Sequence, residues 1–155
     1  MTDTAPVVRP VAARDRDEWQ SLFQAYGVFY KTEFTHDVCD GVWEWLMRDE
    51  HPVRCFVAES NNRVVGFAHV RAQHDTFTAG PSWFLDDLFT TPDARGQGVA
   101  TALIAHVKQD AASRGGGTLR WITASDNHTA QRLYDTLATR TSWVVYQDET
   151  GGSEK

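Results

Sequence analysis

Cysteine is scarce in this sequence of 155 residues, which contains only Cys39 and Cys55. At most one disulfide could join them. Two ordinary buried thiols in a reducing compartment are the interpretation that we favour over that disulfide. We therefore expect a cytoplasmic protein.

The sequence also lacks long hydrophobic runs, and its net charge is not positive. No apolar stretch approaches the roughly 18 residues of a membrane helix, and the polar, proline-interrupted start does not resemble a signal peptide. The formal net charge of −6 argues against nucleic-acid binding, which usually needs a basic face, and favours a cationic substrate. We expect neither a membrane nor a nucleic-acid partner.

The sequence also has no internal repeat, no linker and no histidine spacing typical of a metal site. We therefore expect no metal, and a single domain over residues 1–155 with loose tails at 1–6 and 148–155. Apolar periodicity and turn residues predict its elements. Strands are expected at 7–11, 52–59, 63–72, 83–89, 118–124 and 142–147, and helices at 15–27, 37–49, 99–114 and 127–137.

Several details of these elements can be tested. Gly27 should end the first helix, and Val38, Val42, Trp45 and Leu46 should form the buried face of the second. Asn61-Asn62 should form the turn of a hairpin, because asparagine tolerates left-handed backbone conformations. Strand 118–124 should run parallel to strand 83–89, since a helix connects them. Trp121, Trp143 and Tyr146 are expected in the core.

The most informative stretch is Asp93-Ala94-Arg95-Gly96-Gln97-Gly98-Val99-Ala100, which lies between a predicted strand and a predicted helix. Free backbone N–H groups at a helix start favour anions, and Arg95 adds a positive charge. The third glycine of a dinucleotide-binding fingerprint is missing, because Thr101 stands there, and the Lys-Ser/Thr of a P-loop is missing as well. Judged alone, the stretch is either an anion site or a close strand-to-helix turn.

Two motifs resemble the GCN5-related N-acetyltransferases. Arg95, Gly98 and Ala100 match their Arg/Gln-x-x-Gly-x-Gly/Ala loop, and residues 127–134 match Asn-x-x-Ala-x-x-Leu-Tyr. Residues 84–89 look like the strand before the loop in the Hpa2-like and polyamine acetyltransferase branch. The sequence departs from the family after Tyr134, because Ala138-Thr139-Arg140-Thr141 replaces the usual Leu-Gly before a Phe-rich strand.

The resemblance implies an α/β acyl-CoA N-acyltransferase fold, with a mixed, mostly antiparallel sheet and helices on both faces. It also implies acetyl-CoA as the co-substrate. The residues implied in acetyl-CoA binding are Leu88, Phe89, Thr90, Arg95, Gly96, Gln97, Gly98, Val99, Ala100, Thr101 and Asn127.

The acceptor side is predicted from three residues. In the family, the segment between the first two helices closes over the acceptor, which points to Tyr30 and Glu33. The alternative is that the aromatic residues of this segment are simply core. Asp86 takes the place of the acid beside the acceptor amine, unless it only pairs with a neighbouring arginine. Asp86 and Asp87 are adjacent in a strand and should face opposite sides.

Tyr134 is the predicted general acid. A phenol with a pKa of about 10 is protonated at pH 7, yet it can protonate a thiolate whose own pKa is near 8.5. Without the paired motif, Tyr134 would be taken as a core residue. Asn127 and Tyr134 are seven residues apart, which places both on nearly one helix face, about 10 Å apart along the axis.

The predicted function is direct, acetyl-CoA-dependent N-acetylation of a primary amine, with Tyr134 and Asp86 as the catalytic residues. The acceptor is a small amine, a polyamine or a Lys-like group, and a homodimer is the assembly considered. The alternative is a catalytically silent acyl-CoA sensor or scaffold.

Overall fold

The computed structural model describes residues 5–152, so most of the loose start expected before Val7 lies outside the described residues. The chain divides into two compact units, one ending at Ile122 and one beginning at Thr123. Each unit is described by itself.

The first unit is built on a five-stranded sheet with the strand order β1-β2-β3-β4-β5. Neighbouring strands are antiparallel except β4 and β5, which are parallel. The sheet is therefore mixed and mostly antiparallel, as predicted. Its elements are β1 (Val7–Pro10), the 3₁₀ helix η1 (Ala13–Asp15), α1 (Arg16–Phe29), α2 (His36–Leu46), β2 (Val53–Ser60), β3 (Arg63–Asp75), β4 (Gly80–Thr90), the 3₁₀ helix η2 (Pro92–Ala94), α3 (Val99–Ser113) and β5 (Leu119–Arg120).

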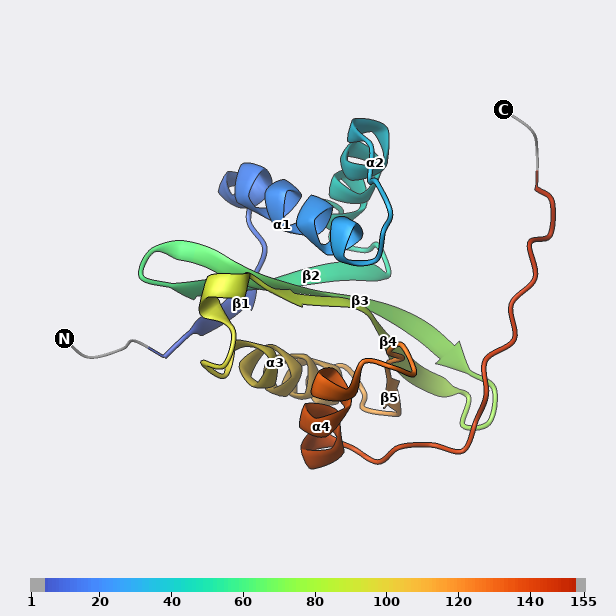
Figure 1. Cartoon of the computed structure of the whole chain (residues 1–155). Helices are drawn as coiled ribbons and strands as arrows, with labels where there is room; N and C mark the ends of the chain where they lie inside the picture. Colours follow the sequence, from blue (N-terminus) through green and yellow to red (C-terminus); the bar gives the residue numbers. More distant parts are fainter. Residues whose placement is uncertain (1–4, 153–155) are drawn as a thin grey trace. The chain divides into compact units, whose positions relative to one another are not determined.

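Helices cover both faces of this sheet, with α1 and α2 on one side and α3 on the other (Figure 1). Side chains alternate along a strand, so each strand supplies both layers. On β3, Phe67 packs on Phe23 of α1, whereas a Cβ at Gly66 would meet Val99 and Leu103 of α3. A core cluster rich in aromatic side chains joins α1 and α2 to the sheet.

Two predicted turns are confirmed. Asn61 and Asn62 join β2 to β3 with φ angles of 52° and 64°, the left-handed values that the turn requires. Three consecutive glycines, Gly115 to Gly117, follow α3 with φ angles of 112°, 70° and 104°. They end the helix where the sequence predicted.

The first two helices differ from the prediction in detail. Gly27 does not end α1, which continues to Phe29. A Cβ at Gly27 would lie 2.8 Å from the Phe34 ring, which stacks on Phe23, so the glycine permits a close approach. In α2 the buried residues are Cys39 and Trp43, whereas two residues of the predicted face, Val38 and Trp45, are 44% and 43% exposed.

The second unit holds α4 (His128–Leu137), and Asn127 caps its N-terminus. The strand expected at 142–147 is wrong, because this segment forms no strand. Trp143 and Tyr146 are 76% and 92% exposed, so they are not core residues. Trp121, at the end of the first unit, is half-buried, and the strand expected at 118–124 is reduced to β5.

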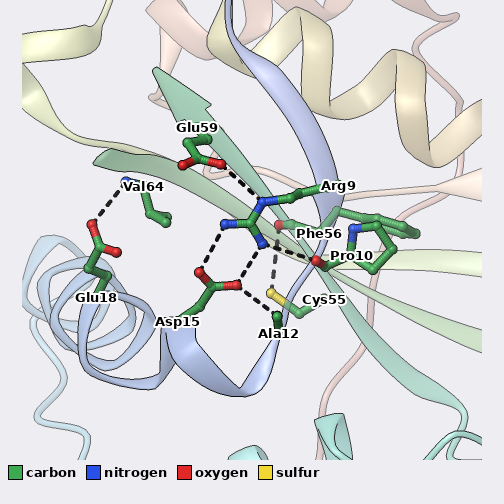
Figure 2. A network of polar contacts seen from close by, with 9 residues as sticks. All are labelled: Arg9, Pro10, Ala12, Asp15, Glu18, Cys55, Phe56, Glu59 and Val64. Carbon is green, nitrogen blue, oxygen red and sulfur yellow. Dashed lines mark hydrogen bonds and ion pairs between the residues drawn. The ribbon is translucent and has the colours of Figure 1, made fainter. Parts of the chain in front are cut away.

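A polar network fixes the entry of the chain into α1 (Figure 2). Asp15 is buried and accepts two hydrogen bonds from the Arg9 guanidinium, at 2.7 and 2.9 Å, and one from the Ala12 N–H at 2.7 Å. Arg9 also contacts Glu59 of β2. The network therefore ties β1, η1 and β2 together.

Candidate functional site

A cavity of about 530 Å³ opens on the α1 and α2 side of the first unit. Aromatic and aliphatic side chains from α1, α2 and the start of β2 form its walls. Trp45 and His51 stack in this wall, with ring centroids 5.2 Å apart. Besides His51, its polar lining comes from β3 and β4 and consists of His69, Arg71, Asp86 and Asp87.

A β-bulge in β4 brings both aspartates to this cavity. Asp87 pairs with His69 and Leu85 pairs with Val70, which leaves Asp86 without a partner in the register. The extra residue breaks the alternation of side chains. The prediction that Asp86 and Asp87 face opposite sides is therefore wrong, since both line one cavity.

Asp86 is held by Arg71 through both carboxylate oxygens, at 3.0 and 2.8 Å. The same hydrogen bonds raise the pKa of Arg71. The ion pair with an arginine that the sequence left open for Asp86 is thus present. It lies in the cavity wall, with the Arg71 and Asp86 side chains 40% and 29% exposed.

Asp87 has a different partner. Its Oδ2 lies 2.8 Å from Nδ1 of His69, and Nε2 of the same ring accepts a hydrogen bond from Nε1 of Trp19 at 2.9 Å. Trp19 and His69 are buried. Asp87 therefore faces an imidazole rather than a guanidinium.

The two other predicted acceptor residues lie between α1 and α2 and are both exposed. Burial and the nearby Asp87 charge raise the pKa of the Tyr30 phenol, which places Tyr30 within electrostatic reach of the cavity. Tyr30 also packs edge-to-face on Tyr26. Glu33 is not among the residues that line the cavity. Of the three predicted residues, only Asp86 lines it.

The glycine loop precedes α3 as predicted. Gly96 and Gly98 have φ angles of 77° and 81°, and a Cβ at either would meet no atom within 4 Å. The first bond of the helix runs from the Ala102 N–H to the Gly98 carbonyl. The N–H groups of Val99, Ala100 and Thr101 are thus left at the positive end of a helix of 15 residues.

Arg95 stands at the edge of this loop. Its Nε donates to the Thr90 carbonyl at 3.1 Å, and its guanidinium lies 5.5 Å from the Phe89 ring centre. Gln97 donates to the Asp93 carbonyl at 3.3 Å. A positive group therefore stands beside open backbone that has room for an anion.

The edge of β4 next to the loop is largely open toward β5. In the described part of the chain, β5 pairs only with Trp83 and Phe84 of β4. Residues 88–90 lie beyond this short ladder, so a ligand could use their backbone groups on that edge. Phe89 itself is buried and Thr90 also pairs with Gly66 of β3.

Asn127 and Tyr134 belong to the second unit. Asn127 caps α4 by accepting a hydrogen bond from the Ala130 N–H at 3.2 Å, and Tyr134 is half-buried on the same helix. Their predicted roles toward acetyl-CoA stay predictions.

Three residues that line this cavity, His69, Arg71 and Asp87, have no role that a sequence motif indicates. The alternation of β3 could have indicated His69, because it falls on the same inward face as Phe67. No such signal pointed to Asp87, because the bulge that turns it toward the cavity leaves no mark in the sequence. Within residues 5–152, no three His, Cys, Asp or Glu side chains gather as metal ligands would, and no helix is long and apolar enough to span a bilayer.

Comparison with known proteins identifies the family. The model of the acetyltransferase (GNAT) family matches residues 16–138, which is most of the chain. The protein belongs to the GNAT family. Members of this kind transfer an acetyl group to an amine, and the GNAT chain is an N-acetyltransferase.

Individual relatives agree with this assignment. D-amino-acid N-acetyltransferase HPA3 of Saccharomyces cerevisiae is 27% identical over 150 residues, which are 95% of the GNAT chain and 92% of the yeast protein. Aminoglycoside N(6')-acetyltransferase type 1 of Salmonella typhimurium is 28% identical over 97 residues, 61% of this chain and 66% of that protein. The predicted Hpa2-like branch stays a prediction, because the relatives differ in acceptor.

Solved structures confirm the fold. Aminoglycoside N-acetyltransferase AAC(6')-Iy in complex with CoA matches with a TM-score of 0.83 at 21% identity, covering 97% of each chain. A probable acetyltransferase matches with a TM-score of 0.82 at 22% identity, covering 96% of this chain and 99% of the other.

Proposed function

We propose that the protein transfers the acetyl group of acetyl-CoA directly to the primary amine of a small molecule or a Lys-like group. The observation that carries this proposal is the cavity between α1, α2 and the sheet, with Asp86 and Asp87 in its wall. A carboxylate attracts an ammonium ion, and the acidic balance of the whole chain acts in the same direction. The relatives that acetylate aminoglycosides and D-amino acids also favour a small acceptor.

Acetyl-CoA would be held at the start of α3. The free N–H groups there, the open backbone at Gly96 and Gly98, and the charge of Arg95 suit a pyrophosphate. Gln97, Val99, Ala100 and Thr101 complete this cradle. The open edge of β4 at residues 88–90 and the side chain of Asn127 would meet the pantetheine arm. When bound, acetyl-CoA supplies an activated thioester.

Two side chains are proposed to assist the transfer. Tyr134 would donate a proton to the departing thiolate. Asp86, clamped by Arg71, would orient the acceptor together with Tyr30 and Glu33, and would relay its proton to water. We expect direct transfer, because Cys39 and Cys55 are buried and burial raises the pKa of both thiols, which disfavours the thiolate nucleophile of a covalent mechanism.

An amine panel tests the proposal. The full chain is incubated with acetyl-CoA and a set of acceptors that includes diamines, polyamines, an aminoglycoside, D-amino acids and a lysine peptide. We expect thiol release and an acetylated product with at least one acceptor. Asp86→Asn should raise the acceptor KM without changing CoA affinity, whereas Asp37→Asn, on the exposed start of α2, should match wild type. CoA binding without turnover on any acceptor would instead favour the silent sensor.

We further propose that the two units form one domain, because the family model spans both of them. Two copies would assemble through the segment from Trp143 to Tyr146, whose four apolar side chains are 71–92% exposed. Extended apolar segments with free backbone groups pair readily with another chain, and identical chains form closed dimers.

A cytoplasmic location is supported by Cys39 and Cys55, which are both free thiols. Cell fractionation tests the location.

A further inference from the structure

A buried chain of hydrogen bonds connects the core under α1 to the acceptor cavity. It runs from Trp19 of α1 to His69 of β3 and on to Asp87 of β4, with contacts of 2.9 and 2.8 Å. Trp19 and His69 are 0% and 2% exposed, whereas the Asp87 side chain is 23% exposed and lines the cavity. His69 and Asp87 both line the cavity, and the Asp87 carboxylate is the most exposed group of the chain.

Trp19 decides which nitrogen of His69 carries the proton. An indole N–H can only donate, so Nε2 of His69 has to accept. The proton of a neutral imidazole then lies on Nδ1, which donates to Asp87. With a proton on Nε2, the His69 N–H would point at the Trp19 indole N–H. The buried indole would then have no hydrogen-bond acceptor, which costs free energy. Trp19 and Asp87 together therefore keep His69 as the neutral Nδ1–H tautomer.

The two aspartates of the cavity consequently differ in charge balance. Arg71 engages both oxygens of Asp86 and neutralises its charge. His69 engages one oxygen of Asp87, and as a neutral ring it does not neutralise this carboxylate, which Arg71 reaches only through the attraction of charges and not through a hydrogen bond. An ammonium group that enters the cavity would therefore find its stronger counter-ion in Asp87.

We propose that Asp87 binds the ammonium group of the acceptor, and that His69, fixed by Trp19, is the positioning residue that holds this carboxylate. The inference rests on the proposed amine acetylation and names the group that selects its substrate. The acceptor class it predicts is a primary ammonium ion.

Binding tests the inference without turnover. Protein labelled with ¹⁵N-histidine is titrated with n-butylamine at pH 7, and the His69 signal is identified by its loss in His69→Asn. We expect a protonated Nδ1, an unprotonated Nε2 and a shift of this signal on titration. Asp87→Asn should abolish the titration shift, and Asp37→Asn, on the exposed start of α2, should keep it. A protonated Nε2, or no amine-dependent shift in the wild type, would overturn the inference.

Kinetics with the best acceptor of the panel separate positioning from stability. Asp87→Asn should raise the acceptor KM at least tenfold and leave the KM for acetyl-CoA within twofold. His69→Phe should raise the acceptor KM about fivefold or more, whereas His69→Asn should restore it, because its amide N–H can replace Nδ1–H. Neither variant offers Trp19 its original acceptor, so both should be less stable than wild type.

The outcomes distinguish the two proposals. If no acceptor is turned over but the titration behaves as expected, the proposed function fails and the ammonium site stands. If the wild type acetylates amines while Asp87→Asn keeps its acceptor KM within twofold, the inference fails and the function stands. If His69→Phe and His69→Asn raise the acceptor KM to the same extent and lose the same stability, His69 has only a structural role.

Discussion

Asp15 and Asp87 show two ways of keeping a carboxylate out of bulk water. The side chain of Asp15 is 3% exposed and is matched by a charged guanidinium, so its charge is compensated inside the protein. Asp87 is more exposed and hydrogen-bonds to a ring that the neighbouring indole keeps neutral. A buried charge is costly unless it is paired. The first residue therefore serves the fold, and the second retains a charge for a ligand.

Asp15 makes the stability of the protein depend on pH. The hydrogen bonds from Arg9 lower its pKa, so the native state keeps the carboxylate ionised at lower pH than the unfolded chain does. The contribution of Asp15 to the free energy of unfolding is complete above about pH 5, where the carboxyl is ionised in the unfolded chain too. This contribution is lost as the pH falls through the lowered native pKa. Asp15→Asn should cost about 3 kcal/mol at pH 7 and flatten this acid dependence.

Urea unfolding at pH 7 and at intervals down to pH 3 measures both effects. Asp17→Asn is the matched control, because Asp17 is exposed on the first turn of α1. It should leave both the stability and its pH profile as in wild type. If the free energy of unfolding of Asp15→Asn falls between pH 7 and pH 3 as steeply as that of wild type, the prediction is contradicted.

Tyr134 is tested by removing its hydroxyl alone. Tyr134→Phe keeps the ring and should leave the fold intact, but kcat should fall by about 10²–10⁴, the usual range for losing a general acid. The KM for acetyl-CoA should change little, because the proton matters chiefly in the transition state. Tyr146→Phe, at a position 92% exposed, is the control. Rates within about threefold of wild type would make Tyr134 a core residue.

At the scale of elements, the start of α3 is the part whose charge should decide CoA binding. Gly98 has a positive φ and open space around it, and Asn and Asp tolerate that conformation better than other side chains. Gly98→Asn and Gly98→Asp therefore impose similar strain and differ in one charge. We expect Gly98→Asp to bind CoA at least tenfold more weakly than Gly98→Asn, as measured by isothermal titration calorimetry. Equal affinities would contradict the anion site.

Local signals predicted most elements, some of their ends and the parallel pairing of β4 with β5, but not the register between strands. The Asn61-Asn62 turn, the glycine stop of α3 and the Asn127 cap follow from backbone preferences that a short stretch carries by itself. The bulge at Asp86 arises from the register between two strands, so no local pattern shows it. Apolar residues at 142–147 satisfy strand propensity without a partner strand. Propensity alone does not supply that partner.

At the scale of the whole molecule, the exposed segment after α4 predicts self-association. Trp143→Ser combined with Tyr146→Ser should convert a dimer into a monomer, because it removes the two aromatic side chains of that segment. Light scattering coupled to size-exclusion chromatography measures the mass. Phe77→Ser is the control, since Phe77 is 97% exposed in the β3–β4 loop and lies outside this segment. A monomeric wild type across micromolar concentrations would refute the dimer.

The alkylation rates of the two buried thiols report how often the parts of the chain around them open. Cys39 lies on the buried face of α2 and Cys55 in β2, at 0% and 3% exposure, and burial raises the pKa of both. An alkylating reagent reacts with thiolate, so it reaches each site only while that part of the chain is open. Equal labelling rates mean that α2 and the sheet open together, and a faster Cys39 means that α2 detaches first. While the chain stays closed, every thiol counted in an acetyl-transfer assay is that of CoA.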